Sequence, residues 1–447
     1  MDIFIKLSQF LLSLSLLIIL HELGHFIPAK LFKTRVEKFY LFFDVKYSLL
    51  KKKIGDTEYG IGWLPLGGYV KISGMIDESM DKEQMALPPQ PWEFRSKPAY
   101  QRLIIMLGGV TVNFILAFII YIGMAFAYGE TYIANDDLKD GLLIENKAML
   151  NVGFKTGDKI LAADGLKIAK FDNDITMKVI MAKEVLIERN GMQQTIKMPN
   201  DFVDQLSKHE KGGLMSIRMP FVVGAISEDS KNTALQPKDV VLKLNGQPAK
   251  YFDQAKAILE NNKNKTIPAT ILRDLKEIEV PVVVTSDGKL GIGVGGLSLS
   301  NLEKLGYYKI SKQEFGFLEA IPVGITKGKD QLIGYGKQLK MIFSPSTGAY
   351  KQVGGFKAIF DIFPNTWSWE TFWNITALLS IMLGVMNLLP IPALDGGHVM
   401  FLLYEIISGK KPSDKFLENA QLVGFVLLIT LLLFANGNDI YKAIVGR

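Results

Sequence analysis

The residues with the clearest chemical potential are His21, Glu22 and His25, near the amino terminus. On a helix, positions i and i+4 lie on one face, so His21 and His25 can present two imidazoles to one metal ion. Neutral imidazole nitrogens suit Zn²⁺, which activates water for hydrolysis when one coordination position stays open. Glu22 would then be the general base that takes a proton from the attacking water. Each histidine taken singly also fits a structural role at a helix end.

A third protein ligand is required, and the segment 387–398 offers one. Pro390 and Pro392 remove backbone donors and interrupt an apolar helix. At membrane depth, such irregular backbone is tolerated only where it is buried in protein or lines a cavity. Asp395 lies in this break and is followed by two glycines, so we expect it to be the carboxylate ligand.

The two remaining histidines receive no ligand role. His398 follows the expected carboxylate ligand closely, and we interpret it as a supporting residue because three protein ligands already leave the open position that hydrolysis needs. His209 lies in a separate domain, too far along the chain from any expected span to reach the site.

Four apolar stretches must position these residues: 3–20, 103–128, 373–389 and 420–435. About 20 apolar residues cross the hydrocarbon core as a helix, so the last stretch is short for a span. The helical pattern of the first stretch continues through the histidine cluster to Phe32. A signal peptide is disfavoured because Asp2 and Lys6 make a poor basic region and no small-residue cleavage site follows.

The Lys and Arg residues beside these stretches predict their orientation. The clusters are Lys30, Lys33, Arg35 and Lys38; Arg95, Lys97 and Arg102; and Lys410, Lys411 and Lys415. All three clusters fall on one side of a four-span topology, and that side should be cytoplasmic. Both termini and residues 129–369 are then expected outside, with the His and Asp motifs in the cytoplasmic half.

The composition excludes several classes of protein. The absence of cysteine rules out disulfides, cysteine-ligated zinc and thiol catalysis. A net charge of +6 over 447 residues gives no nucleic-acid-binding patch. The mean hydropathy of +0.19 is too apolar for an ordinary soluble protein, whereas 21% charged residues are too many for a chain embedded throughout in lipid. We therefore expect apolar spans joined to polar domains, and Lys51, Lys52 and Lys53 as a solvated loop near anionic lipid.

The outside segment contains an internal repeat. Asp158 with Asp164-Gly165 recurs as Asp239 with Asn245-Gly246, at a constant offset of 81 residues. In each copy a short apolar strand ends in a pair of residues typical of a tight hairpin. The repeat resembles tandem PDZ domains. These domains bind a peptide as an added strand and often hold its C-terminal carboxylate in a loop. A spacer at the mouth of the membrane domain is the alternative.

The combination of motifs resembles the site-2 proteases, the zinc metalloproteases that cut within membranes. The resemblance rests on two motifs, His-Glu-x-x-His at 21–25 and Asn-x-x-Pro-x-Pro-x-Leu-Asp-Gly at 387–396. The four spans and the tandem PDZ-like repeats resemble the RseP-like bacterial branch of this family. The resemblance covers essentially the whole chain. It implies Zn²⁺ at His21, His25 and Asp395, Glu22 as general base, and Asn387, Pro390 and Pro392 in substrate positioning. The usual Ala-Gly-Pro of the second span is replaced here by Gly108-Gly109-Val110, while Asn113 fits the pattern.

The segment 58–72 resembles the membrane-associated β-hairpin of these proteases, with a turn at 65–68. An open strand edge could hold an unwound substrate by strand addition, so Gly62, Gly67 and Gly68 are candidate substrate-binding residues. A small hairpin that only anchors the loop is the alternative.

The resulting fold class is a polytopic α-helical membrane protein with four spans, a membrane-associated β-hairpin and two periplasmic PDZ-like α+β domains. The expected divisions are 1–128 with the first two spans and the hairpin, 129–212 and 213–297 as the PDZ-like domains, 298–371 as an outer-surface connector, and 372–447 with the last two spans. The connector includes a helix at 313–343, lying either on the membrane surface or against the second repeat.

The resemblance implies an inner-membrane endopeptidase acting on single-span membrane proteins, such as trimmed anti-sigma factors and remnant signal peptides. Partners are then these substrates, the lipid bilayer and peptide C-termini at the PDZ-like domains, with no nucleic acid. The rival hypothesis is a non-catalytic PDZ-containing membrane scaffold whose metal site is structural. Glu22 separates the two, because a structural site has no use for a carboxylate that does not ligate.

Overall fold

The computed structural model describes residues 2–65, 67–75, 87–171, 175–208, 213–227 and 230–445, so His209 lies outside the described residues. The chain forms two compact units. The first comprises Met1–Gly129, Glu314–Phe343 and Tyr350–Arg447, and the second comprises Glu130–Gln313 and Ser344–Ala349.

The described part of the first unit is a helical bundle with one small sheet. Its helices are α1 (Asp2–Leu31), α3 (Ala99–Tyr128), α9 (Phe317–Ile342), α10 (Phe356–Ile362), α11 (Trp369–Leu388), α12 (Asp395–Ser408) and α13 (Asp414–Val445). Four of them are long and apolar enough to cross a membrane, over Ile3–Leu31, Ala99–Tyr128, Trp369–Leu388 and Asp414–Tyr441. Each coincides with one of the four apolar stretches of the sequence, which confirms a polytopic membrane protein.

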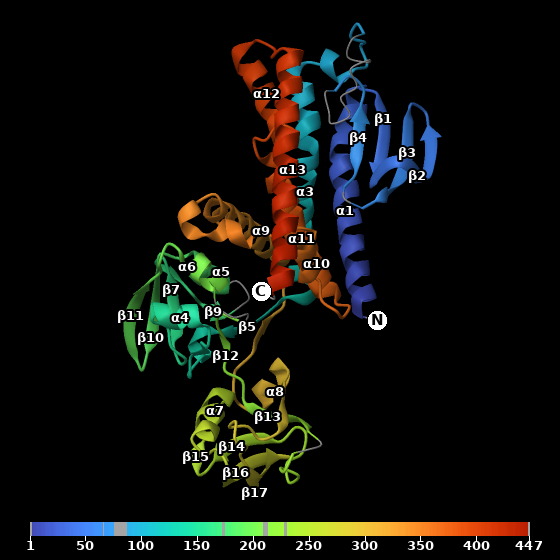
Figure 1. Ribbon diagram of the computed structural model, residues 1–447. Helices are drawn as coiled ribbons and strands as arrows, with labels where there is room; N and C mark the ends of the chain where they lie inside the picture. Colours follow the sequence, from blue (N-terminus) through green and yellow to red (C-terminus); the bar gives the residue numbers. More distant parts are fainter. Residues whose placement is uncertain are drawn as a thin grey trace. The chain divides into compact units, whose positions relative to one another are not determined.

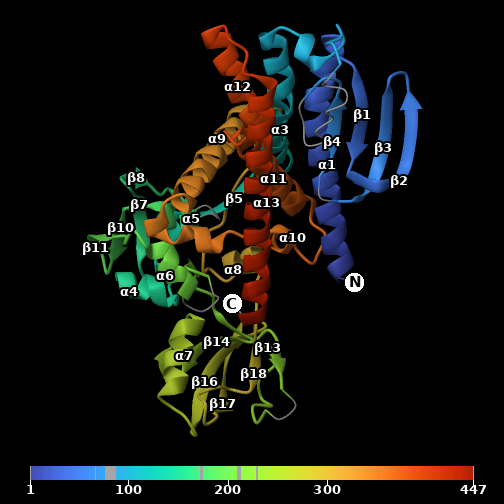
Figure 2. The ribbon, with the colours of Figure 1, turned by 45° about the horizontal axis from the view of Figure 1, so that its top comes forward.

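Helix α3 is the centre of this bundle. It packs against α1, α9, α11 and α12, and α1 and α11 run beside it (Figures 1 and 2). Glycines allow close approach between the helices: a β-carbon at Gly324 of α9 would lie 2.4 Å from the Ile122 nitrogen, and one at Gly328 would lie 2.6 Å from the Phe118 ring. The helix expected over 313–343 therefore exists and packs directly on α3.

The sheet of the first unit differs from the expected hairpin. Its strands are β1 (Val36–Leu41), β2 (Phe43–Ile54), β3 (Thr57–Leu64) and β4 (Tyr69–Ile72), in the order β2-β3-β1-β4. The two strands expected in 58–72 are present as β3 and β4, but they do not pair with each other. Strand β1 lies between them, parallel to β3 and antiparallel to β4. The expected β3–β4 hairpin was wrong because the segment 36–41, for which no strand was predicted, supplies the central strand.

The second unit is built from two copies of one β-rich module. The first copy contains β5 (Glu130–Ala134), β6 (Leu142–Leu143), α4 (Lys147–Val152), β7 (Lys159–Ala163), β8 (Leu166–Lys167), β9 (Lys170–Phe171), α5 (Ile175–Met181), β10 (Glu184–Arg189), β11 (Met192–Lys197), α6 (Phe202–Lys208) and β12 (Ser216–Ile217). The second contains β13 (Phe221–Ile226), β14 (Val240–Leu244), β15 (Gln247–Pro248), α7 (Phe252–Glu260), β16 (Thr266–Arg273), β17 (Lys276–Val283) and β18 (Ile292–Gly295). Helix α8 (Leu299–Lys304) and β19 (Ser311–Gln313) follow, and β19 pairs with β5.

The repeated turns have the expected form. Asp164 and Gly165 have φ angles of +46° and +76° between the antiparallel strands β7 and β8. Asn245 and Gly246 have φ angles of +50° and +73° between β14 and β15. Two successive positive φ angles are the signature of a type I′ turn, which Asp-Gly and Asn-Gly favour. The tight hairpins predicted from the repeat are confirmed.

A buried ion pair also recurs in the two modules. Asp158 accepts two hydrogen bonds from the Arg189 guanidinium, at 2.6 and 2.7 Å. Asp239 accepts two from Arg273, at 2.8 and 2.7 Å. Each aspartate also accepts a backbone N–H from the residue three positions earlier, Lys155 or Gln236. The recurrence shows that the sequence repeat is a structural repeat.

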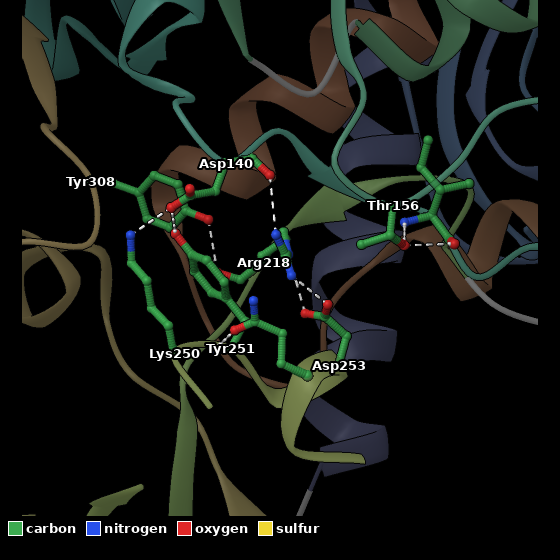
Figure 3. A network of polar contacts seen from close by, with 9 residues as sticks. Asp140, Thr156, Arg218, Lys250, Tyr251, Asp253 and Tyr308 are labelled. Carbon is green, nitrogen blue, oxygen red and sulfur yellow. Dashed lines mark hydrogen bonds and ion pairs between the residues drawn. The ribbon is translucent and has the colours of Figure 1, made fainter. Parts of the chain in front are cut away.

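The two modules are joined by a polar network at their junction (Figure 3). Asp140 of the first module accepts hydrogen bonds from Lys250 and from the Tyr251 hydroxyl, at 2.5 and 2.6 Å. Arg218, between the modules, donates to Asp253 at 2.6 Å, and its guanidinium lies 4.4 Å from the centre of the Tyr251 ring. The Tyr308 hydroxyl donates to the Arg218 carbonyl at 2.8 Å.

The hydrophobic cores give domain limits that differ from those predicted from the sequence. One core is formed mainly by side chains between Ile133 and Met215, but Tyr251, Leu302 and Tyr308 are buried in it. The other core lies between Phe221 and Leu290. Residues 298–313 therefore belong to the second unit rather than to a connector, because their apolar side chains complete the first core.

Candidate metal centre

Helix α1 presents His21 and His25 on one face toward α3. Both are buried, with 8% and 7% of their surface exposed. The helices can approach closely here because glycines meet at the crossing: a β-carbon at Gly108 would lie 1.8 Å from the Gly24 carbonyl oxygen. Gly109 makes room for the imidazoles, since a β-carbon there would lie 2.3 Å from Nε2 of His25. Gly108 thus lets α1 approach α3 closely, and Gly109 leaves the space that the two rings occupy.

Asp395 reaches the same place from the start of helix α12. Helix α11 ends at Leu388, and Asp395 is the first residue of α12 after the proline-containing loop. Glycines bring this helix start close to the loop, because a β-carbon at Gly396 would lie 2.3 Å from the Leu389 carbonyl oxygen. The carboxylate oxygen Oδ2 of Asp395 is buried and has no hydrogen-bond partner among the described residues.

The three side chains have the spacing of a tetrahedral metal site. Oδ2 of Asp395 lies 3.4 Å from Nε2 of His21 and 3.3 Å from Nε2 of His25, and the two Nε2 atoms are 3.4 Å apart. A tetrahedral Zn²⁺ with ligands at about 2.1 Å requires neighbouring ligand atoms about 3.4 Å apart. Two imidazoles and one carboxylate are also a donor set that zinc accepts. The residues therefore fit zinc, and the orphaned carboxylate oxygen is explained by a cation between them.

The hydrogen-bond contacts of the two imidazoles also favour metal binding. Nδ1 of His25 lies 2.8 Å from the Ile105 carbonyl oxygen. A carbonyl only accepts, so Nδ1 carries the hydrogen and Nε2 keeps its lone pair. The other ring is flanked by two amides: Nδ1 of His21 lies 3.0 Å from the Asn113 side chain, and its Nε2 lies 3.2 Å from the Asn387 side chain. The Asn113 contact is to the ring nitrogen that faces away from the cluster, and such outer contacts commonly fix the orientation of metal-binding histidines. The Asn387 amide instead lies beside Nε2, the nitrogen that faces Asp395.

A cavity of about 520 Å³ opens at this cluster. His21, Glu22, His25 and Asp395 line it together, as does the segment 68–72 that contains strand β4. Glu22 lines the cavity together with Val70 of β4 and is not one of the three clustered ligands. The general-base candidate and the ligand candidates therefore face one cavity.

Only some of the other expected site residues lie at the cavity or the metal cluster. Gly68 lines the cavity, and a β-carbon there would lie 2.4 Å from Ile18. Gly62 and Gly67 instead pack against Phe43, by its carbonyl and its ring respectively. Asn387 lies at the metal cluster through its contact with His21. The remaining two, Pro390 and Pro392, lie in the loop between α11 and α12, outside the cavity lining.

Sequence reasoning missed a polar group at the cavity formed by Lys38, Asp44 and Tyr69. The Tyr69 hydroxyl donates to Asp44 at 2.8 Å, and the Lys38 ammonium lies 3.4 Å from the same carboxylate. Against the effect of burial, these two groups hold the pKa of Asp44 below its usual range. Burial, reinforced by the hydrogen bond to Asp44, raises the pKa of Tyr69. Their distant positions on β1, β2 and β4 gave no common signal in the sequence.

Comparison with known proteins agrees with this geometry. A family model described as Peptidase family M50 matches residues 9–431. A Clostridium perfringens protein that carries the name of a zinc metalloprotease is 28% identical over 434 residues, covering 96% of this chain and 97% of its own. A Haemophilus influenzae protein named regulator of sigma E protease is 27% identical over 465 residues, covering 98% and 99%.

The family match extends over nearly the whole chain and includes both segments that form the cluster. The M50 family comprises the site-2 proteases, and its members use zinc. The chain therefore belongs to peptidase family M50 and is a zinc metalloprotease.

Proposed function

We propose that the protein is an intramembrane endopeptidase that cleaves single-span membrane proteins within or near their membrane spans. The observation that carries the proposal is the position of the cavity. His21 and His25 lie on a helix long and apolar enough to cross a membrane, and Asp395 follows the end of another. Ionisable residues at such positions are costly and mark functional sites.

His21, His25 and Asp395 are proposed to hold the zinc ion, with Glu22 as general base. When bound, zinc polarises the scissile carbonyl and lowers the pKa of water to about 7. Glu22 takes the proton of the attacking water onto its carboxylate and donates it to the leaving amine nitrogen. Asn387, whose amide lies beside His21, is proposed to donate a hydrogen bond to the substrate backbone, and Pro390 and Pro392 to shape the adjoining loop.

Strand β4 is proposed to hold the substrate in an extended conformation. A helical peptide bond is shielded by its own hydrogen bonds, so a substrate span must unwind before it is cut. Among the strands that the structure describes, β4 pairs only with β1, and its residues line the cavity beside Glu22. An unpaired strand edge can bind an extended peptide by strand addition. Gly68 keeps this edge close to α1, and Gly62 and Gly67 support the sheet behind it.

The second unit is proposed to be a tandem of PDZ-like domains on the periplasmic side of the inner membrane. This is supported by the structural repeat and by the clusters of Lys and Arg beside the spans, which favour a cytoplasmic active-site side and outside termini. The tandem would admit trimmed substrates, such as shortened anti-sigma factors and remnant signal peptides, and exclude longer ones by size. Binding of peptide C-termini at these domains is part of the same proposal.

The decisive experiment replaces Glu22 by Gln in the full chain reconstituted with a single-span substrate. We expect cleavage to fall by at least about 10²-fold, because general acid–base catalysis contributes about 10²–10⁴-fold, while zinc content stays at one ion per chain. Glu418→Gln, half-buried near the start of α13 and absent from the cavity lining, is the matched control and should cleave normally. Undiminished cleavage by Glu22→Gln with zinc retained would remove Glu22 as the base. No cleavage by any variant, wild type included, would favour a non-catalytic scaffold.

A further inference from the structure

Helix α13 contributes none of the proposed ligands, yet one of its side chains reaches the loop that carries Asp395. Gln421 is 4% exposed and lines the same cavity as the metal cluster. Its side-chain oxygen Oε1 accepts a hydrogen bond from the Ala393 backbone nitrogen at 3.1 Å. A polar amide inside an apolar span is costly unless it is hydrogen-bonded, and it then commonly has a functional reason.

The residue that Gln421 holds is conformationally unusual. Ala393 has a φ angle of +81°, a conformation that residues with a β-carbon rarely adopt. It stands two positions before Asp395, where the chain turns from the proline-containing loop into α12. Such strained backbone persists only when its surroundings hold it in place. The conformation of Ala393 sets the direction in which α12 begins, and thus where the Asp395 carboxylate points.

The backbone of α13 is fitted to the same loop. A β-carbon at Gly424 would lie 1.6 Å from the Pro392 carbonyl oxygen, so this position requires glycine for contact. Residues 421 and 424 lie on one face of the helix because they are three positions apart. Gly424 therefore lets α13 touch the loop, and Gln421 supplies the hydrogen bond beside that contact.

We propose that Gln421 is a positioning residue of the metal centre. Its carboxamide keeps Ala393 in the left-handed conformation, and Asp395 thereby stays within ligand distance of His21 and His25. The inference rests on the ligand set of the proposed function, but it concerns metal binding and needs no substrate. The fourth span, which carries no ligand, is in this way a structural part of the metal centre.

The test measures metal binding by the full chain in detergent with Gln421→Leu and Gln421→Asn. The first variant removes the acceptor, and the second keeps an amide in the helix but shortens its reach by one methylene. We expect both to weaken zinc binding about 10–100-fold in competition with a chelator, the usual effect of losing an outer contact of a metal site. The visible spectrum of the Co²⁺-loaded protein should also change, because it reports ligand geometry. Thr430→Val, on the exposed part of the same helix, should alter neither quantity.

A second substitution distinguishes positioning from general packing. Ala393→Gly removes the strain at φ +81°, because glycine adopts this conformation freely. In the Gln421→Asn background it should restore most of the zinc affinity and the Co²⁺ spectrum. Wild-type zinc affinity and spectrum in both Gln421 variants would overturn the inference, as would an equal loss in Thr430→Val or no recovery with Ala393→Gly. Failure of the wild type to cleave substrate would refute the proposed function and leave this result standing.

Discussion

A β-carbon added to Gly109 would lie 2.3 Å from Nε2 of His25 and 2.6 Å from Cε1 of His21. Contacts this short are not adopted by real side chains, and the atoms affected belong to both histidines of the cluster. The α1–α3 crossing is therefore built around the missing side chain of Gly109. Its role depends on the space beside the imidazoles, not on backbone flexibility, since the residue lies within the regular helix α3.

Gly109→Ala should accordingly disrupt metal binding. One or both imidazoles must move from the position that faces Asp395, and we expect zinc affinity to fall by at least about 10-fold, as for loss of a supporting contact. Gly123→Ala is the matched control, because it lies on the same helix and a β-carbon there meets nothing within 4 Å. Zinc content and affinity of the two purified variants provide the measurement. Equal zinc affinity in both would show that the crossing accommodates a side chain.

Asn113 should be the partner that fixes the ring of His21. Its side chain is fully buried at 3.0 Å from Nδ1, and its Oδ1 has no hydrogen-bond partner among the described residues. When Nε2 of a neutral imidazole binds a metal, Nδ1 carries the hydrogen and needs an acceptor. If the Asn113 amide group is rotated by 180°, its Oδ1 and Nδ2 exchange places, and Oδ1 becomes the acceptor beside Nδ1 of His21. Asn113→Leu should therefore weaken zinc binding about 10–100-fold.

The control for Asn113 is Asn374→Leu, a substitution at a half-buried amide on α11, away from the cluster. Nitrogen chemical shifts of labelled histidine would report the tautomer of His21 directly. Hydrogen on Nδ1 of zinc-loaded wild type agrees with the prediction. A zinc affinity in Asn113→Leu equal to that in Asn374→Leu would contradict it.

The parts of this fold that were readable from sequence are those governed by local pattern. The four spans follow from long apolar runs, the type I′ turns from Asp164-Gly165 and Asn245-Gly246, and the pairing of His21 with His25 from helical periodicity. Asp395 was inferred because prolines interrupt an apolar helix beside it. Each of these signals lies within a short stretch of chain, where the types and spacing of neighbouring residues determine the local structure.

The parts that were not readable depend on contacts between distant segments. No strand was predicted at β1, and its position between β3 and β4 depends on pairing with both of them. Tyr251 and Leu302 belong to the first core although they follow it by many residues. Gln421 was visible as an amide within an apolar run, but its partner Ala393 depends on how α13 meets the loop. Such tertiary pairings leave no periodic trace in one sequence.

The repeated ion pairs should each stabilise their own module. Asp158 is fully buried, and Asp158→Ala leaves the Arg189 guanidinium without its bidentate partner and the Lys155 N–H without an acceptor. Losing a buried partner of this kind costs about 2–4 kcal/mol. Hydrogen exchange of the full chain should show faster exchange across β7 and β10. Asp137→Ala, a nearby aspartate outside this pair, is the control, and equal exchange in the two variants would contradict the prediction.

The junction of the two modules should weaken in acid. Asp140 accepts hydrogen bonds from Lys250 and Tyr251, and these hold the pKa of its carboxyl below the usual range. A carboxyl whose pKa is lower in the folded state adds stability above its unfolded pKa of about 3.9, and this stability is lost as the pH falls through the folded value. The side chains of Asp140 and Lys250 are 39% and 49% exposed, so solvent screening limits the contribution to about 1 kcal/mol or less. Between pH 6 and pH 3, hydrogen exchange at β6 and α7 should accelerate, after correction for the intrinsic rate, more in wild type than in Asp140→Asn. Asp136→Asn, whose side chain is 96% exposed, should behave like wild type. An identical pH dependence in Asp140→Asn and wild type would show that this carboxylate does not hold the modules together.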